Sequence, residues 1–225
     1  MSWKIAVGIL ALFYVAFLLP RYIIKEKRNG IEHAVAPKLA LSAVFCLVGL
    51  LGVLAQSGSV FSLLIFGGLL FSLLGDYYLV FVESDCRKFI VGVLSFSVAQ
   101  ILYIAAMILK KGLSQWEFLA AAVILAVFLA FQVKCKPDME KAAIPLTVYA
   151  LLVIFMASKA TVMLAFPAFQ MTAQILFSAG ALLFLISDSF LGLWRYTAHK
   201  HIFRNVVSIC YFTGQLMIAS SLLFE

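Results

Sequence analysis

Long runs of apolar residues constrain the fold of this chain more than any other feature. Residues 59–82 read "SVFSLLIFGGLLFSLLGDYYLVFV", with a single charged side chain. About 20 such residues in a helix cross the ~30 Å hydrocarbon core of a bilayer. Of the 225 residues, 65% are hydrophobic and only 12% are charged, whereas about a quarter are charged in a soluble domain. We therefore predict an integral membrane protein and not a soluble helical bundle.

The apolar runs predict eight transmembrane helices in an all-α bundle. An open sheet is excluded because its edges would leave unpaired backbone groups in lipid. The first run is followed by "PRYIIKEKR", so we interpret it as an uncleaved span and not as a signal peptide. The linkers are short, which predicts one domain over residues 1–225. The expected spans are 3–24, 37–55, 59–82, 89–109, 116–133, 142–164, 170–193 and 206–224.

The basic residues predict the orientation of these spans. The chain has 17 Lys and Arg against 10 Asp and Glu, an excess that lipid headgroups and cytoplasmic loops explain without nucleic acid. The positive-inside rule then predicts a cell-membrane protein with both termini outside the cytoplasm. Only Lys4, Lys110, Lys111 and Lys159 fall elsewhere than after spans one, three, five and seven. The basic residues assigned to those four cytoplasmic loops are Arg21, Lys25, Lys27, Arg28, Lys38, Arg87, Lys88, Lys134, Lys136, Lys141, Arg195, Lys200 and Arg204.

The two halves of the sequence resemble each other. When Asp76 is aligned with Asp188, Gly68 falls on Gly180, and the next spans align at Gln100 and Gln215. We predict two parallel four-helix repeats, about 1–110 and 111–225, related by an axis along the membrane normal. Chance similarity between apolar segments is the alternative.

Two aspartates are the strongest candidates for chemistry. Asp76 and Asp188 lie 17 and 18 residues into spans three and seven, which places both at a similar depth. An ionised aspartate near a helix centre costs roughly 2.5–3.5 kcal/mol on insertion scales, so such residues face the bundle interior and are usually functional. The alternative role is interhelical hydrogen bonding.

Amides and tyrosines near the aspartates are candidates for substrate binding. Gln100 lies on one face of span four with Gly92, Phe96, Tyr103 and Met107, and we expect this face to pack toward Asp76. Ordinary packing is an equally good reading of each amide and tyrosine. We expect Lys159 to extend toward the outer headgroups, with a salt bridge as the alternative. The full set of candidate binding residues is Gln100, Gln215, Tyr77, Tyr103, Tyr149 and Tyr211.

No metal or cofactor is predicted. The three histidines, His33, His199 and His201, all fall in predicted loops, so none is available beside the aspartates to bind zinc. The four cysteines have no C-x-x-C spacing and are expected to be free thiols.

The pieces "GGLLFSLLGDYYLV", "FIVGVLSFSVAQILYIAAM", "PLTVYALLVIFMA", "SAGALLFLISDSFLGLWRY" and "YFTGQLMIASS" resemble the YhhN family of lysoplasmalogenase-like membrane proteins. The resemblance implies an ether hydrolase that cleaves the vinyl-ether bond of a lysoplasmalogen into a fatty aldehyde and a glycerophospho-ethanolamine or -choline. It implies Asp76 and Asp188 as catalytic residues, with Gln215 and Tyr211 at the polar "YFTGQ" element. Family members often have histidine where Gln100 stands.

A vinyl ether is cleaved by acid, because protonating its β-carbon gives an oxocarbenium ion that water traps. One carboxylic acid and one carboxylate suffice, as in glycosidases, and burial disfavours ionisation of one of them. Which aspartate is the acid stays open, with Asp76 as our first choice. The alternatives are a small-molecule or proton-coupled transporter, which also uses membrane carboxylates, and a non-catalytic lipid-binding protein that would tolerate neutral replacements of both aspartates.

Overall fold

The computed structural model describes residues 2–81, 85–135, 143–194 and 201–225, and within these ranges the regular structure is helical throughout. The elements are α1 (Ser2–Phe13), a π-helical turn (Tyr14–Leu18), α2 (Leu19–Asn29), a 3₁₀ turn (Ile31–Ala34), α3 (Val35–Ala55), α4 (Val60–Leu79), α5 (Cys86–Lys110), α6 (Gln115–Cys135), α7 (Ala143–Ala165), α8 (Met171–Leu193) and α9 (His201–Ser221). The all-helical prediction is confirmed.

The helices α1 and α2 form one continuous rod through a π-helical turn. Pro20 lies at the start of α2, where it cannot donate a backbone hydrogen bond and its ring crowds the preceding turn. The chain widens there, and the Leu19 N–H donates to the carbonyl of Tyr14, five residues back. The first predicted span is therefore a single helix that extends beyond residue 24.

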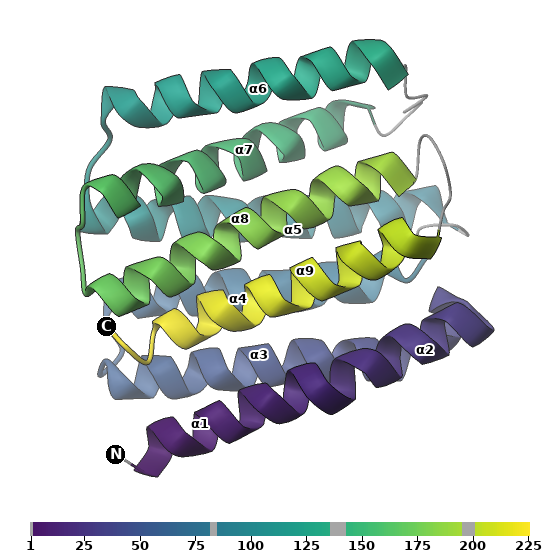
Figure 1. The fold of residues 1–225 in the computed structure, drawn as a ribbon, viewed down its shortest axis with the longest axis horizontal. Helices are drawn as coiled ribbons and strands as arrows, with labels where there is room; N and C mark the ends of the chain where they lie inside the picture. The colour runs from purple at the N-terminus through teal and green to yellow at the C-terminus, as the bar shows by residue number, and fades with distance from the viewer. Residues whose placement is uncertain (1, 82–84, 136–142, 195–200) are drawn as a thin grey trace.

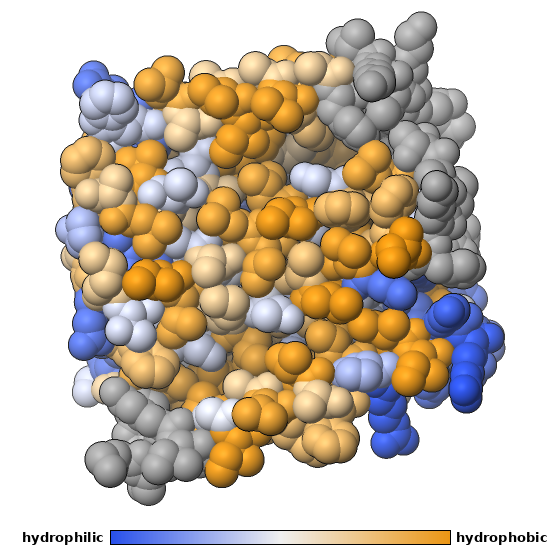
Figure 2. All heavy atoms as spheres, viewed as in Figure 1, coloured by the Kyte–Doolittle hydropathy of each residue, from blue (hydrophilic) through white to orange (hydrophobic). Residues whose placement is uncertain are grey.

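Seven helical segments of the described chain are long and apolar enough to cross a membrane. The remaining expected span, the fifth (116–133), corresponds to α6, whose apolar part Gln115–Ala130 is shorter than the other spans. Hydrophobic residues cover the middle of the face drawn in Figure 2, and hydrophilic residues gather toward its ends. The chain is thus a multi-pass membrane bundle.

The helices form two layers (Figure 1). One layer runs α6, α7, α8, α9 and the α1–α2 rod, and the other runs α5, α4 and α3, with α5 against α7 and both α3 and α4 against α9. The two chain ends lie at the same end of the bundle. This agrees with the even number of traverses that the sequence predicts.

Small residues allow the closest helix pairs to approach. At Gly180 of α8, an added Cβ would lie 2.6 Å from the Gly214 carbonyl oxygen of α9. In the α4–α5 pair, Gly68 packs against the Tyr103 ring and Gly75 against the Phe96 ring. Close backbone approach at small residues is a main source of helix association in lipid, where no hydrophobic force drives it.

Lys159 does not extend to the headgroups, so that prediction is wrong. Its side chain is fully buried, and Nζ lies 2.9 Å from Glu117 Oε1 of α6. Nζ also donates to the Lys111 and Gly112 carbonyls at 2.9 and 2.8 Å, so all three ammonium protons have acceptors. This ion pair fixes the start of α6 to α7.

The basic residues of the predicted cytoplasmic loops are only partly described. Lys136, Lys141, Arg195 and Lys200 lie outside the described residues, as does His199. His33 is exposed in the 3₁₀ turn. In the described chain Arg204 Nε donates to Glu26 Oε1 at 2.8 Å, which joins α9 to α2.

We expect Lys159→Met to lower the melting temperature strongly, because it leaves the Glu117 charge buried without a partner. Removing one partner of a buried ion pair costs about 3–5 kcal/mol. The measurement is thermal unfolding of the purified protein in detergent. Lys110→Met is the control, since Lys110 and its partner Glu225 are partly exposed and such pairs contribute about 1 kcal/mol or less. Equal melting temperatures for the two variants would contradict the assigned role.

Candidate functional site

Asp76 lies near the C-terminal end of α4, where α3 and α9 also meet. It is only 1% exposed. Its Oδ2 accepts hydrogen bonds from Ser42 Oγ of α3 at 2.6 Å and from the Tyr211 hydroxyl of α9 at 2.7 Å. Its Oδ1 lies 3.4 Å from Lys38 Nζ of α3. An apparently bare carboxylate in the sequence is therefore an ion-paired one with two hydroxyl donors.

Lys38 was predicted to be a loop residue on the cytoplasmic side, and this prediction is wrong. It lies in the first turns of α3 and is buried against Asp76. Ser42 follows it by four residues, so both side chains project from the same face of the helix. The available signal was the position of Lys38 after Pro37, inside the apolar run and not before it.

Asp188 lies in α8, also near the C-terminal end of its helix, and is half-buried. Its Oδ2 accepts a hydrogen bond of 2.6 Å from the Tyr149 hydroxyl of α7. Among the described residues no lysine or arginine lies within ion-pair distance of this carboxyl group. The two aspartates thus have different surroundings, although each accepts a hydrogen bond from a tyrosine hydroxyl.

Aromatic rings connect the two carboxyl groups. The Phe96 ring of α5 lies 6.3 Å from the Tyr149 ring and 5.8 Å from the Tyr211 ring, centroid to centroid. Phe184 of α8 packs against both Phe96 and Tyr211, at 6.2 and 5.5 Å. We call Phe96, Tyr149, Phe184 and Tyr211 the aromatic cluster. Each aspartate is therefore bonded to one tyrosine of the same cluster.

A second polar group lies one turn deeper. The Tyr103 hydroxyl donates to Gln215 Oε1 at 2.9 Å, and Gln215 Nε2 donates to Ser72 Oγ at 2.9 Å. Tyr103, Gln215 and Ser72 are all fully buried. They join α5, α9 and α4, and Ser72 is one turn from Asp76 on α4.

Gln100 is buried without a hydrogen bond. Its side chain is 0% exposed, and neither Nε2 nor Oε1 has a partner among the described residues. Leaving such a group unsatisfied costs about 1–3 kcal/mol. With Gly92, Phe96, Tyr103 and Met107 it lies on the buried face of α5, as the sequence predicted.

Tyr77 is the predicted candidate that the structure separates from the others. It is 42% exposed and packs against the rings of Tyr78 and Phe81. The remaining five candidate binding residues are all buried or half-buried inside the bundle. Sequence reasoning missed Lys38, Ser42 and Ser72 as polar members of this region.

A sequence model described as the YhhN family matches residues 34–222. No curated protein matches the chain. No solved structure matches it either. The matched range includes Asp76, Asp188 and Gln215 together with the residues that contact their polar atoms.

We expect Lys38→Met to destabilise the protein by about 3–5 kcal/mol, because the Asp76 carboxylate then stays buried without its cation. Adding Asp76→Asn to Lys38→Met removes both charges and should recover part of the melting temperature. Thermal unfolding of the single and double variants measures this coupling. Lys88→Met is the control, since Lys88 and Asp85 are exposed. If the double variant is as unstable as the sum of the two single variants, the ion pair has no energetic role.

Proposed function

We propose that this chain, which belongs to the YhhN family, is a membrane hydrolase that cleaves the vinyl-ether bond of lysoplasmalogens. The products are a fatty aldehyde and a glycerophospho-ethanolamine or -choline. One observation carries the proposal: buried Asp76 and half-buried Asp188, from different halves of the chain, each accept a hydrogen bond from a tyrosine, and the rings of those two tyrosines both pack against Phe96.

The surroundings favour Asp188 as the acid, which reverses our first choice from the sequence. An ion pair and two hydroxyl donors all stabilise the charged form of Asp76. Asp188 has one hydroxyl donor in the described chain and a low-dielectric setting, which suits a carboxyl group that keeps its proton. One protonated and one ionised carboxyl group is the pair that this chemistry needs.

The proposed reaction has three steps: protonation of carbon, addition of water and collapse of the hemiacetal. The Asp188 proton adds to the β-carbon of the vinyl ether, whose π electrons form the new C–H bond and leave an oxocarbenium ion. Water adds to the cationic carbon and gives its proton to a carboxylate. The hemiacetal C–O bond breaks as the glycerol oxygen takes a proton from the carboxylic acid so formed, and the hemiacetal hydroxyl gives its own proton back to that carboxylate as the aldehyde C=O forms, so one water is consumed overall. The Asp76 carboxylate and the faces of the aromatic cluster favour the cation electrostatically.

We place the protein in the cell membrane. The end of the bundle that carries the four predicted cytoplasmic loops would face the cytoplasm, and both chain ends would lie outside. Asp76 and Asp188 lie toward that same end, because both are close to the C-termini of helices that run toward it. A lysolipid bound there could keep its phosphate among the basic residues and its chain in the apolar core.

We infer that the two halves are repeats and that each contributes one aspartate to a paired site. If residues 1–110 and 111–225 are equivalent, Gly68 and Tyr103 correspond to Gly180 and Ile218. In each case the glycine packs against the corresponding residue of the next helix. Ser42 of α3 and Tyr149 of α7 likewise come from the second helix of each half.

We expect Asp188→Asn and Asp76→Asn each to reduce aldehyde release at least about 100-fold, since general acid–base groups contribute about 10²–10⁴-fold. The assay incubates purified protein with a lysoplasmalogen and with its saturated-ether analogue, and only the first should give aldehyde. Tyr77→Phe is the matched control, because Tyr77 adjoins Asp76 in sequence but is exposed. Because Asp76→Asn leaves Lys38 unpaired, it is also tested with Lys38→Met. Parent rates in both aspartate variants would refute the mechanism.

We further expect Tyr149→Phe to lower kcat by about tenfold, whereas the control Tyr77→Phe should leave kcat unchanged. Tyr149 orients the Asp188 carboxyl group through its 2.6 Å hydrogen bond, and a misdirected acid transfers its proton less efficiently. The phenyl ring keeps the packing against Phe96, so the melting temperature should change little. Steady-state kinetics and thermal unfolding on the same preparations measure both. A large loss of stability with unchanged kcat would make Tyr149 structural.

A further inference from the structure

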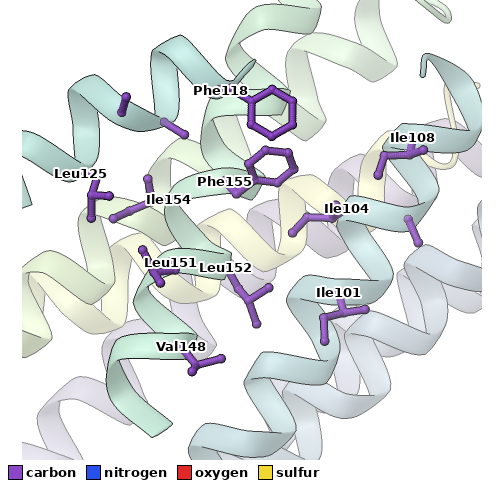
Figure 3. A pocket seen from close by; sticks show the side chains of 13 residues that line it. Ile101, Ile104, Ile108, Phe118, Leu125, Val148, Leu151, Leu152, Ile154 and Phe155 are labelled. Atoms are coloured by element: carbon purple, nitrogen blue, oxygen red, sulfur yellow. The ribbon is translucent and has the colours of Figure 1, made fainter. Parts of the chain in front are cut away.

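An apolar groove lies between α5, α6 and α7 (Figure 3). Its volume is about 760 Å³, within the roughly 300–1,000 Å³ that small-molecule sites occupy. The side chains that line it are all hydrocarbon. The groove therefore offers nothing to a headgroup, and the chemistry that fits it is an alkyl chain.

The groove exists because α6 packs chiefly against α7 and stands off from α5. If the halves are repeats, the contact between α9 and the α1–α2 rod corresponds to that between α5 and α6, and there the space is filled. The α1–α2 rod packs against α9 through Tyr22 and Phe212, through a hydrogen bond from the Tyr14 hydroxyl to the Phe212 carbonyl, and through the Glu26–Arg204 pair. The groove lies where α5 and α6 lack such contacts. Apolar space of this kind in a membrane is filled by hydrocarbon.

The two ends of the groove differ. At one end the rings of Phe118 and Phe155 pack with their centroids 5.5 Å apart (Figure 3). The buried Glu117–Lys159 ion pair is close to these rings, because Glu117 precedes Phe118 and Lys159 lies one turn after Phe155 on α7. At the other end lies Val148, next in sequence to Tyr149, and Leu152 lies one turn from Tyr149. One end is thus blocked by rings, and the other begins beside the tyrosine that holds Asp188.

We propose that this groove binds the alkenyl chain of the lysolipid substrate, with the vinyl ether at the Tyr149 end and the chain terminus against Phe118 and Phe155. The inference rests on the proposed function and adds that the groove determines which chain lengths of the substrate are preferred. From Val148 to Phe155 the helix rises about 10 Å, so the groove accommodates the distal part of a long chain. A short chain would end before the groove is filled.

The first test fills the groove. Ala121 of α6 lines it, whereas Val123, two residues on, is not among its lining residues and is 60% exposed. We expect Ala121→Trp to lower kcat/KM for a long-chain lysoplasmalogen at least about tenfold, the order that one misplaced methylene costs in an apolar pocket. The value for a short-chain substrate should stay unchanged, and Val123→Trp should change neither. An equal loss with both chain lengths, or no loss with either, would overturn the inference.

The second test does not require turnover. A saturated-ether lysolipid with a diazirine at the chain terminus is photolysed with purified wild-type protein, Ala121→Trp and Val123→Trp, and the labelled peptides are identified. Labelling should fall on the Phe118 and Phe155 peptides and be lost in Ala121→Trp only. Excess unlabelled lysolipid should compete for it and a diacyl phospholipid should not. Labelling elsewhere, or equal competition by diacyl lipid, would refute the groove as a lysolipid site. Absence of aldehyde from wild-type protein would refute the proposed function separately.

Discussion

A charge inside a membrane must be balanced within the protein, and the structure depends on how this chain does so. Water cannot solvate Asp76 in the bundle, so Lys38, Ser42 and Tyr211 take its place. These partners come from α3 and α9, which fixes both helices against α4. The Glu117–Lys159 pair does the same for α6 and α7 at the opposite end. The polar contacts thus select one arrangement of helices from the many that apolar surfaces alone would permit.

The partners that balance charge also make the two aspartates chemically different, although their sequence contexts are similar. Each belongs to a matching apolar segment, yet only Asp76 has a cation and two hydroxyl donors, while Asp188 has a single tyrosine donor in the described chain. A hydrolase that protonates carbon and then stabilises a cation needs one carboxyl group of each kind. If the two halves are the repeats that the sequence predicts, their divergence is a direct way to obtain one carboxyl group of each kind.

The sequence predicted the elements well because hydrophobicity over 20 residues is set locally. The spans, the buried face of α5 and the burial of Asp76 all follow from residue spacing. Side-chain partners could not be predicted in this way. Lys38 was assigned to a loop and Lys159 to the outer headgroups, since a lysine near a helix end usually extends there, but each pairs with a carboxylate on a neighbouring helix. Whether Gln100 has a partner depends on the helices packed against α5, and no spacing within α5 contains that information.

The groove and the aromatic cluster together suggest how a lipid could reach a site packed with rings. Polar contacts hold α3, α4 and α9 around Asp76, and opening that side would break an ion pair. Between α5 and α6 only hydrocarbon contacts line the groove, so separating these helices exchanges one apolar surface for another at little free-energy cost. A chain entering there reaches Val148 and Tyr149 before it meets a charged residue. Gln100, on the adjoining turn of α5, has no hydrogen-bond partner among the described residues, so under the proposed function its Nε2 can donate to the ether oxygen and its Oε1 can accept from a water. Under the proposed function, the side of the bundle that is lined by hydrocarbon is also the side next to Tyr149, the hydrogen-bond partner of Asp188, which suits an enzyme that takes its substrate from a membrane.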